Sequence, residues 1–96
     1  MKNEIDGRGF VVSPEATTSF HDDGIVILHT GHGSLFTANR AGARIWRGVE
    51  QKLPLETIAQ QISGEYQITL TTAREHTTRF VAELERQTLI QLEVAR

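Results

Sequence analysis

The chain has 96 residues, no cysteine, and a net charge of −2 from ten basic and twelve acidic residues. This length suits one domain with one modest core. The missing cysteines exclude disulfides and Cys-ligated zinc, and the balanced charge gives no reason to expect binding to nucleic acid or a membrane. No apolar run approaches the ~20 residues of a membrane span, and the N-terminus lacks the apolar stretch of a signal peptide. We therefore expect a cytoplasmic protein.

The first part of the chain predicts strands. We expect residues 1–15 to form an N-terminal arm that is partly loose, and residues 16–96 to form the folded domain. Two turn signals follow, Asp22-Asp23-Gly24 and Thr30-Gly31-His32-Gly33, and Asp-Gly favours a type I′ hairpin. They predict a three-stranded antiparallel meander within residues 16–38. The run at residues 25–28 is apolar on both faces, so we expect something to cover each face.

The second part of the chain predicts three helices. Asn39 is a good N-cap, and Gly42, Ile45, Trp46 and Val49 share one helical face, which places Trp46 in the core. Two further apolar stripes follow at helical spacing. The expected helices cover residues 39–50, 54–64 and 72–87. The fold class is thus α+β, a three-stranded antiparallel meander followed by three helices, which is winged-helix-like.

Local signals suggest where the later elements begin and end. Gly64 is expected to terminate the second helix in the left-handed conformation. Thr72-x-x-Glu75 is a capping-box pattern that would open the third helix. The apolar residues of 89–92 would form a terminal extended piece that closes the core.

Catalytic and metal-binding patterns are weak. His29 and His32 could hold a metal, but spacing supplies no third ligand, so we interpret them as surface histidines. No serine lies in a Gly-x-Ser-x-Gly elbow, and we expect no catalytic residue and no cofactor. Arg40, Arg44 and Arg47 share one side of the first helix; they could hold a carboxylate, although a solvated face is the commoner meaning.

The third expected strand, residues 34–37, is an edge strand. A meander gives it one neighbour, and its other side would expose unpaired backbone groups that proteins usually protect with charge or proline. This strand has neither. Residues 10–12 or 89–92 could pair with the edge and close it. Alternatively, the edge stays open for a strand from a partner.

The order and spacing of several short motifs resemble the PqqD-like family over about residues 16–94. The motifs are Gly33-Ser-Leu-Phe-Thr-x-Asn39-x-x-Gly42-Ala-x-Ile45-Trp46, Leu55-Glu-x-Ile58, Glu65-Tyr66, Phe80-x-x-x-Leu84 and Leu89-Ile90.

This resemblance implies three strands followed by three helices, and a peptide-binding adaptor that is not an enzyme. The leader segment of a ribosomally made precursor peptide would add as a strand to the third strand and lie against the third helix. The adaptor would present the peptide to a modifying enzyme of radical-SAM, protease or cyclase type. The expected peptide-binding residues are Ser34, Leu35, Phe36, Thr37, Arg74, Thr77, Thr78, Val81 and Glu85.

Three positions depart from the family pattern. Ala38 stands where the family usually has Leu, His76 where it often has Asp, and Thr88 where it usually has Gly. These differences bear on the shape of the peptide pocket and on the exit from the third helix.

The alternative function is a winged-helix DNA-binding protein. Its recognition helix would need a basic patch. The third helix instead balances its charges, and we favour the adaptor. The charged residues are Arg74, Arg79 and Arg86 against Glu75, Glu83 and Glu85.

Overall fold

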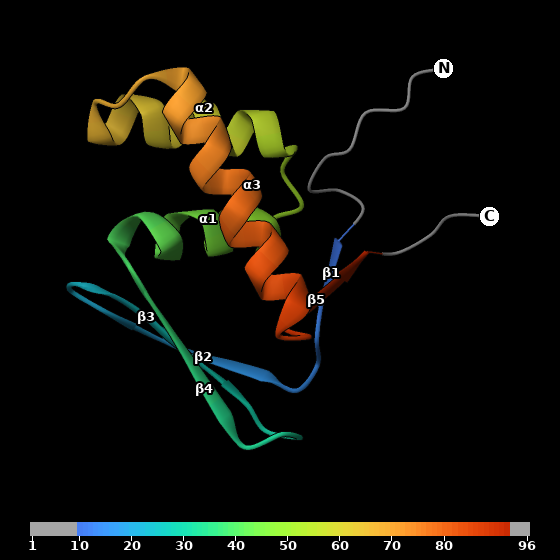
Figure 1. The fold of residues 1–96 in the computed structure, drawn as a ribbon. Helices are drawn as coiled ribbons and strands as arrows, with labels where there is room; N and C mark the ends of the chain where they lie inside the picture. Colours follow the sequence, from blue (N-terminus) through green and yellow to red (C-terminus); the bar gives the residue numbers. More distant parts are fainter. Residues whose placement is uncertain (1–9, 93–96) are drawn as a thin grey trace.

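The structure is a computed structural model that describes residues 10–92. A three-stranded sheet and three helices form its main body, and a small two-stranded sheet lies beside them (Figure 1). The elements are β1 (Phe10–Val12), β2 (Ala16–His21), β3 (Gly24–His29), β4 (Ser34–Asn39), α1 (Arg40–Glu50), α2 (Leu55–Tyr66), α3 (Leu70–Arg86) and β5 (Ile90–Leu92). The predicted α+β fold and its element order are confirmed. Within residues 10–92, none of the helices is both long and apolar enough to span a membrane.

Strands β2, β3 and β4 form the predicted antiparallel meander. The first turn differs from the expected type I′ hairpin. Its two loop residues are Asp22 and Asp23, and neither has the positive φ that a type I′ turn requires. Gly24 instead begins β3 with a φ of 154°, where a Cβ atom would collide with the carbonyl oxygen of Ala38. Glycine is therefore needed here for close packing of β3 against β4.

All three helices lie on one face of this sheet (Figure 1). Ile25, Ile27 and His29 point toward the helices and are buried, whereas Val26 and Leu28 point the other way and are half-buried. The expectation that both faces are covered is wrong for the described residues, because no described element lies against the second face. β3 is apolar on both sides although only one side faces the core.

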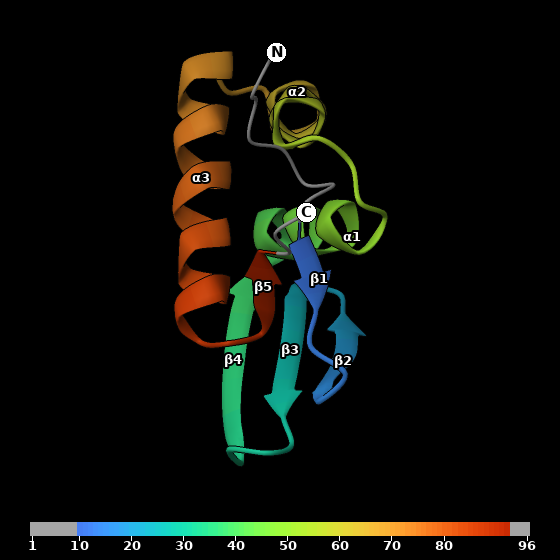
Figure 2. The ribbon, with the colours of Figure 1, turned by 90° about the vertical axis from the view of Figure 1, so that its right-hand side faces the viewer.

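The two short terminal strands pair with each other. β1 and β5 are antiparallel, with Phe10 opposite Leu92 and Val12 opposite Ile90. They make a separate sheet beyond the end of the meander (Figures 1 and 2). The predicted extended piece at residues 89–92 is thus confirmed, and neither terminal segment closes the edge of β4.

The core lies where α1 meets the sheet, α2 and α3. Trp46 is fully buried, as predicted, and its stripe neighbours Gly42, Ile45 and Val49 are buried with it. Gly48 allows α1 to approach α2, because a Cβ there would lie 2.6 Å from the Cγ1 atom of Ile58. The stripes predicted for α2 and α3 also supply buried side chains.

Two helix ends differ from their predicted positions. α2 runs through Gly64 to Tyr66, and its C-cap residue Gln67 takes the left-handed conformation with φ 55°. α3 begins before Thr72, because the Thr69 hydroxyl accepts a hydrogen bond from the Thr72 N–H at 3.1 Å. Thr69 is therefore the N-cap, and the capping box expected at Thr72 does not form.

The C-terminal end of α3 places Thr88 in a backbone conformation that favours glycine. The Leu89 N–H donates to the Leu84 carbonyl at 2.9 Å, and the Thr88 N–H donates to the Glu85 carbonyl at 3.0 Å. This pair of bonds is a Schellman motif, which places Thr88 in the left-handed region with φ 59°. A β-branched residue is strained there, because its Cβ crowds the backbone.

We expect Thr88→Gly to stabilise the fold by about 1 kcal/mol. The change removes a left-handed penalty of roughly 1–2 kcal/mol, and the greater freedom of glycine in the unfolded chain offsets part of this gain. Urea unfolding measures the difference. A variant less stable than the parent would show that the threonine carries no strain.

Replacing Trp46 with alanine should cost about 3–5 kcal/mol, because it leaves a cavity at the centre of the core. This is a large part of the stability of a domain of this size. Trp46→Phe, which keeps an aromatic ring, should cost less. Denaturant unfolding measures both, and a loss below about 1 kcal/mol for the alanine variant would contradict the packing described here.

Candidate functional site

Strand β4 has an open edge. It pairs with β3 on one side, and no other described strand lies on its second side. The two-residue β2–β3 loop makes His21 and Gly24 a hydrogen-bonded pair. By alternation, Phe36 bonds to β3, while Leu35 and Thr37 direct their N–H and C=O groups to the open edge. β4 carries no charged residue and no proline to block a further strand.

Helix α3 runs along the β4 side of the sheet, away from β2 (Figures 1 and 2). The two elements touch through aromatic rings. The ring centres of Phe36 and Phe80 lie 5.8 Å apart at an interplanar angle of 57°, a geometry that aromatic pairs favour. Both side chains are half-buried. The open edge of β4 is therefore bordered by an apolar contact with α3.

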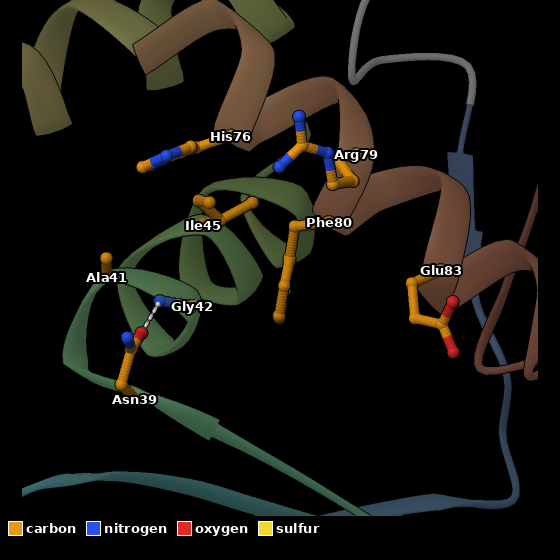
Figure 3. Close-up of a pocket in the computed structure, with 8 residues that line it drawn as sticks. All are labelled: Asn39, Ala41, Gly42, Ile45, His76, Arg79, Phe80 and Glu83. Atoms are coloured by element: carbon orange, nitrogen blue, oxygen red, sulfur yellow. Dashed lines mark hydrogen bonds between the residues drawn. The ribbon is translucent and has the colours of Figure 1, made fainter. Parts of the chain in front are cut away.

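A pocket of about 380 Å³ lies where the end of β4 and the start of α1 face α3 (Figure 3). Its apolar part comes from Ile45 of α1 and Phe80 of α3. Polar side chains of α3 surround this part. The lining residues are Asn39, Ala41, Gly42, Ile45, His76, Arg79, Phe80 and Glu83.

Local sequence explains this pocket. The Asn39 side chain accepts a hydrogen bond from the Gly42 N–H at 3.0 Å, which caps α1 directly at the end of β4 (Figure 3). Gly42 then leaves room for α3, because a Cβ there would lie 2.6 Å from the Cβ of Ala38 and 2.9 Å from the Phe80 ring. The predicted N-cap is confirmed, and Gly42 is needed for the close approach of Phe80.

The strand residues predicted to bind peptide lie together at the open edge. Ser34, Leu35 and Thr37 are exposed, and Phe36 is half-buried toward the helices. Two predicted residues of α3 are part of the core, since Thr77 is 1% and Val81 is 4% exposed. The side chains of Thr77 and Val81 are therefore buried beneath the surface of the protein.

The other three predicted residues of α3 do not lie beside β4. At 100° per residue, Arg74, Thr78 and Glu85 fall on the flank nearly opposite His76 and Glu83. Peptide contacts of these three residues, and of Thr77 and Val81, stay predictions, but the structure does not place them with residues 34–37. Sequence reasoning missed the four pocket residues of α3. The departure from the family pattern at His76 was one signal that pointed to them. They are His76, Arg79, Phe80 and Glu83.

Arg74 already has a partner on α2. Its Nε and Nη2 atoms donate to the two carboxylate oxygens of Glu56 at 2.9 and 2.8 Å. These hydrogen bonds and the positive charge lower the pKa of the Glu56 carboxyl below its ordinary value. The bidentate pair joins α3 to α2 and fixes the Arg74 flank on that side of the helix.

The two histidines considered for a metal site contact each other. The rings of His29 and His32 are stacked with their centres 3.9 Å apart, and the His32 N–H donates to His29 Nδ1 at 3.2 Å. Glu15 Oε1 lies 3.6 Å from the same Nδ1 atom. Within residues 10–92, no group of three metal-ligating side chains comes together.

Comparison with known proteins identifies a family and two similar structures. The family described as "Coenzyme PQQ synthesis protein D (PqqD)" matches residues 24–90. TbiB1, solved in complex with the TbiA(beta) leader peptide, is 26% identical with a TM-score of 0.77, over 88% of this chain and 98% of that one. Lasso peptide synthetase B1, complexed with its leader peptide, shares the fold at 23% identity and a TM-score of 0.78, over 85% of this chain and 96% of that one. A comparison with curated protein sequences finds no match.

The ion pair between Arg74 and Glu56 gives a testable titration. Arg74→Gln should raise the pKa of Glu56 toward its ordinary value, because the main cause of the lowered value is the bond to Arg74. A carboxyl whose pKa is lowered by folding stabilises the fold above its unfolded-state pKa, and this contribution is lost as pH falls through the folded-state pKa. The variant should therefore lose stability near neutral pH and little at strongly acidic pH.

Side-chain carboxyl NMR measures this pKa. The matched control is Arg86→Gln, which should move the pKa of Glu83 and leave that of Glu56 in place, since Arg86 pairs with Glu83. An unchanged Glu56 pKa in the Arg74 variant would mean that the pair does not persist in solution.

Proposed function

Because the chain belongs to the PqqD family, we propose that it is an adaptor that binds the leader segment of a ribosomally made precursor peptide. The observation that carries this proposal is the open edge of β4, bordered by α3 and by the pocket at the start of α1. The similarity to TbiB1, a protein solved with a leader peptide bound, supports it. The leader would add to β4 as a fourth strand.

Backbone pairing would position the peptide without binding it tightly. Leu35 and Thr37 offer two N–H and two C=O groups at the edge, and four bonds contribute about 2–6 kcal/mol in total. Association costs about 4–15 kcal/mol. Side-chain contacts must therefore supply the remaining free energy.

The pocket between α1 and α3 is suited to supply these contacts. Its volume of about 380 Å³ lies within the usual range for binding sites, and Ile45 and Phe80 give it an apolar floor. An apolar side chain of the leader would enter here, next to the Phe36–Phe80 contact. His76, Arg79 and Glu83 would then contact the leader residues next to that side chain and favour those whose polar groups complement their own.

We further propose that the protein presents the peptide and catalyses no step itself. The chemistry would belong to a modifying enzyme of radical-SAM, protease or cyclase type. A cytoplasmic location fits a partner peptide that is made on ribosomes.

The DNA-binding alternative has less support. Arg74 and Arg86 of α3 are each paired with a glutamate, which leaves this helix with little free positive charge. Steeply salt-dependent binding to random duplex DNA would favour that alternative.

The edge can be tested with a matched pair of proline variants. Thr37→Pro removes an N–H that points to the open edge and leaves the β3–β4 bonds in place, because Thr37 does not bond to β3. We expect binding of a leader peptide that the parent chain binds, selected from a library of precursor leaders, to weaken about tenfold or more, since one bond is lost and the peptide's approach is obstructed. Calorimetry measures the affinity.

The control is Thr18→Pro on the other edge of the sheet. By the same alternation its N–H points away from β3, so the substitution removes an edge N–H from β2 and leaves the β2–β3 bonds in place. This variant should bind the leader like the parent chain. Equal affinities for both variants, with both folded, would contradict strand addition at β4.

A further inference from the structure

The face of the meander that points away from the helices carries no aspartate, glutamate, lysine or arginine side chain. Alternation along the three strands determines which side chains lie on it. Leu28 and Leu35 are cross-strand neighbours at its centre, and Leu35 is 67% exposed. The residues on this outer face are Thr17, Ser19, His21, Val26, Leu28, Leu35 and Thr37. Contiguous exposed apolar surface marks interaction sites, and these two leucines form the apolar centre of the face.

The outer face is continuous with the open edge of β4. Leu35 and Thr37 direct their backbone groups to the edge and their side chains to this face. A peptide strand on β4 would place the residues opposite Leu35 and Thr37 on the same face. The intervening peptide residues would point toward α3 and the pocket. The bound peptide would therefore widen the outer face by one strand.

We propose that this widened outer face is the docking surface for the peptide-modifying enzyme. This inference rests on the proposed function, because the peptide supplies the fourth strand of the surface. The enzyme would contact Leu28, Leu35 and the outward side chains of the leader together. It would thereby distinguish the loaded adaptor from the empty one.

The size of the face favours such a partner over a second copy of this chain. Three strands of six residues cover about 290 Å², from a strand spacing of about 4.8 Å and a rise of about 3.3 Å per residue. Stable interfaces bury about 800 Å² on each partner. The peptide strand enlarges the face by about a third and leaves it below this size, so the face suits a transient partner of an adaptor that must release its cargo better than a stable dimer.

The test compares Val26→Thr/Leu28→Thr with the parent chain, because both side chains point outward from β3 and neither residue lies at the peptide edge of β4. Threonine keeps the strand preference and removes apolar surface from the face. The probe is the purified enzyme that modifies the precursor of the bound leader, measured by biolayer interferometry with and without the synthetic leader peptide. We expect the parent to bind the enzyme more tightly when loaded, and the double variant to lose about tenfold or more of that affinity. Its affinity for the leader peptide alone should be unchanged.

The matched control is Val11→Thr, which removes an exposed apolar side chain from β1, away from this face. It should bind the enzyme like the parent. Parent-like enzyme affinity in the folded double variant would overturn the proposal, as would sedimentation showing that the parent dimerises through this face. Failure of the parent to bind the leader would instead refute the proposed function, and the separate peptide measurement distinguishes the two. Should the double variant fail to fold, Leu28→Thr alone carries the same expectation.

Discussion

The hydrogen bond between the Asn39 side chain and the Gly42 N–H determines how the two parts of this fold meet. Asn39 ends β4 and caps α1, so no loop separates sheet from helix. The direction of β4 thereby fixes the start of α1, and α1 carries Trp46 into the core. α3 then packs on α1 where Gly42 admits the Phe80 ring. The position of α3 beside the open edge follows from this junction.

Much of the fold could be predicted because its signals are local. Turn residues and apolar stripes recur at spacings that depend only on backbone geometry, and they identified the meander, the helices and the buried Trp46. The helix ends could not be predicted in the same way. Left-handed residues follow all three helices at Lys52, Gln67 and Thr88, none of them a glycine. Tertiary contacts act at such positions, as in the 2.6 Å hydrogen bond from Lys52 Nζ to the Phe10 carbonyl.

The candidate site was predictable on its strand side only. An uncharged edge strand can be recognised from sequence, and residues 34–37 do lie at the open edge. Which flank of α3 faces that edge depends on the rotation of the helix about its axis. Two long-range contacts reveal that rotation, the Phe36–Phe80 ring contact on one flank and the Arg74–Glu56 pair on the other. Both flanks carry similar polar residues, so composition could not separate them.

An open strand edge carries a risk of aggregation, and the fold keeps this one open even though two terminal strands are available. β1 and β5 satisfy each other's backbone groups instead of pairing with β4. Because side chains alternate along β4, its two faces have different surroundings. Phe36 faces α3 and the pocket, whereas Leu35 and Thr37 face outward. The side chains of a peptide strand added there would alternate in the same way. One set would contact the adaptor, and the other set would face outward. Peptide affinity and recognition by a second protein could therefore change independently, because they depend on opposite faces of one strand.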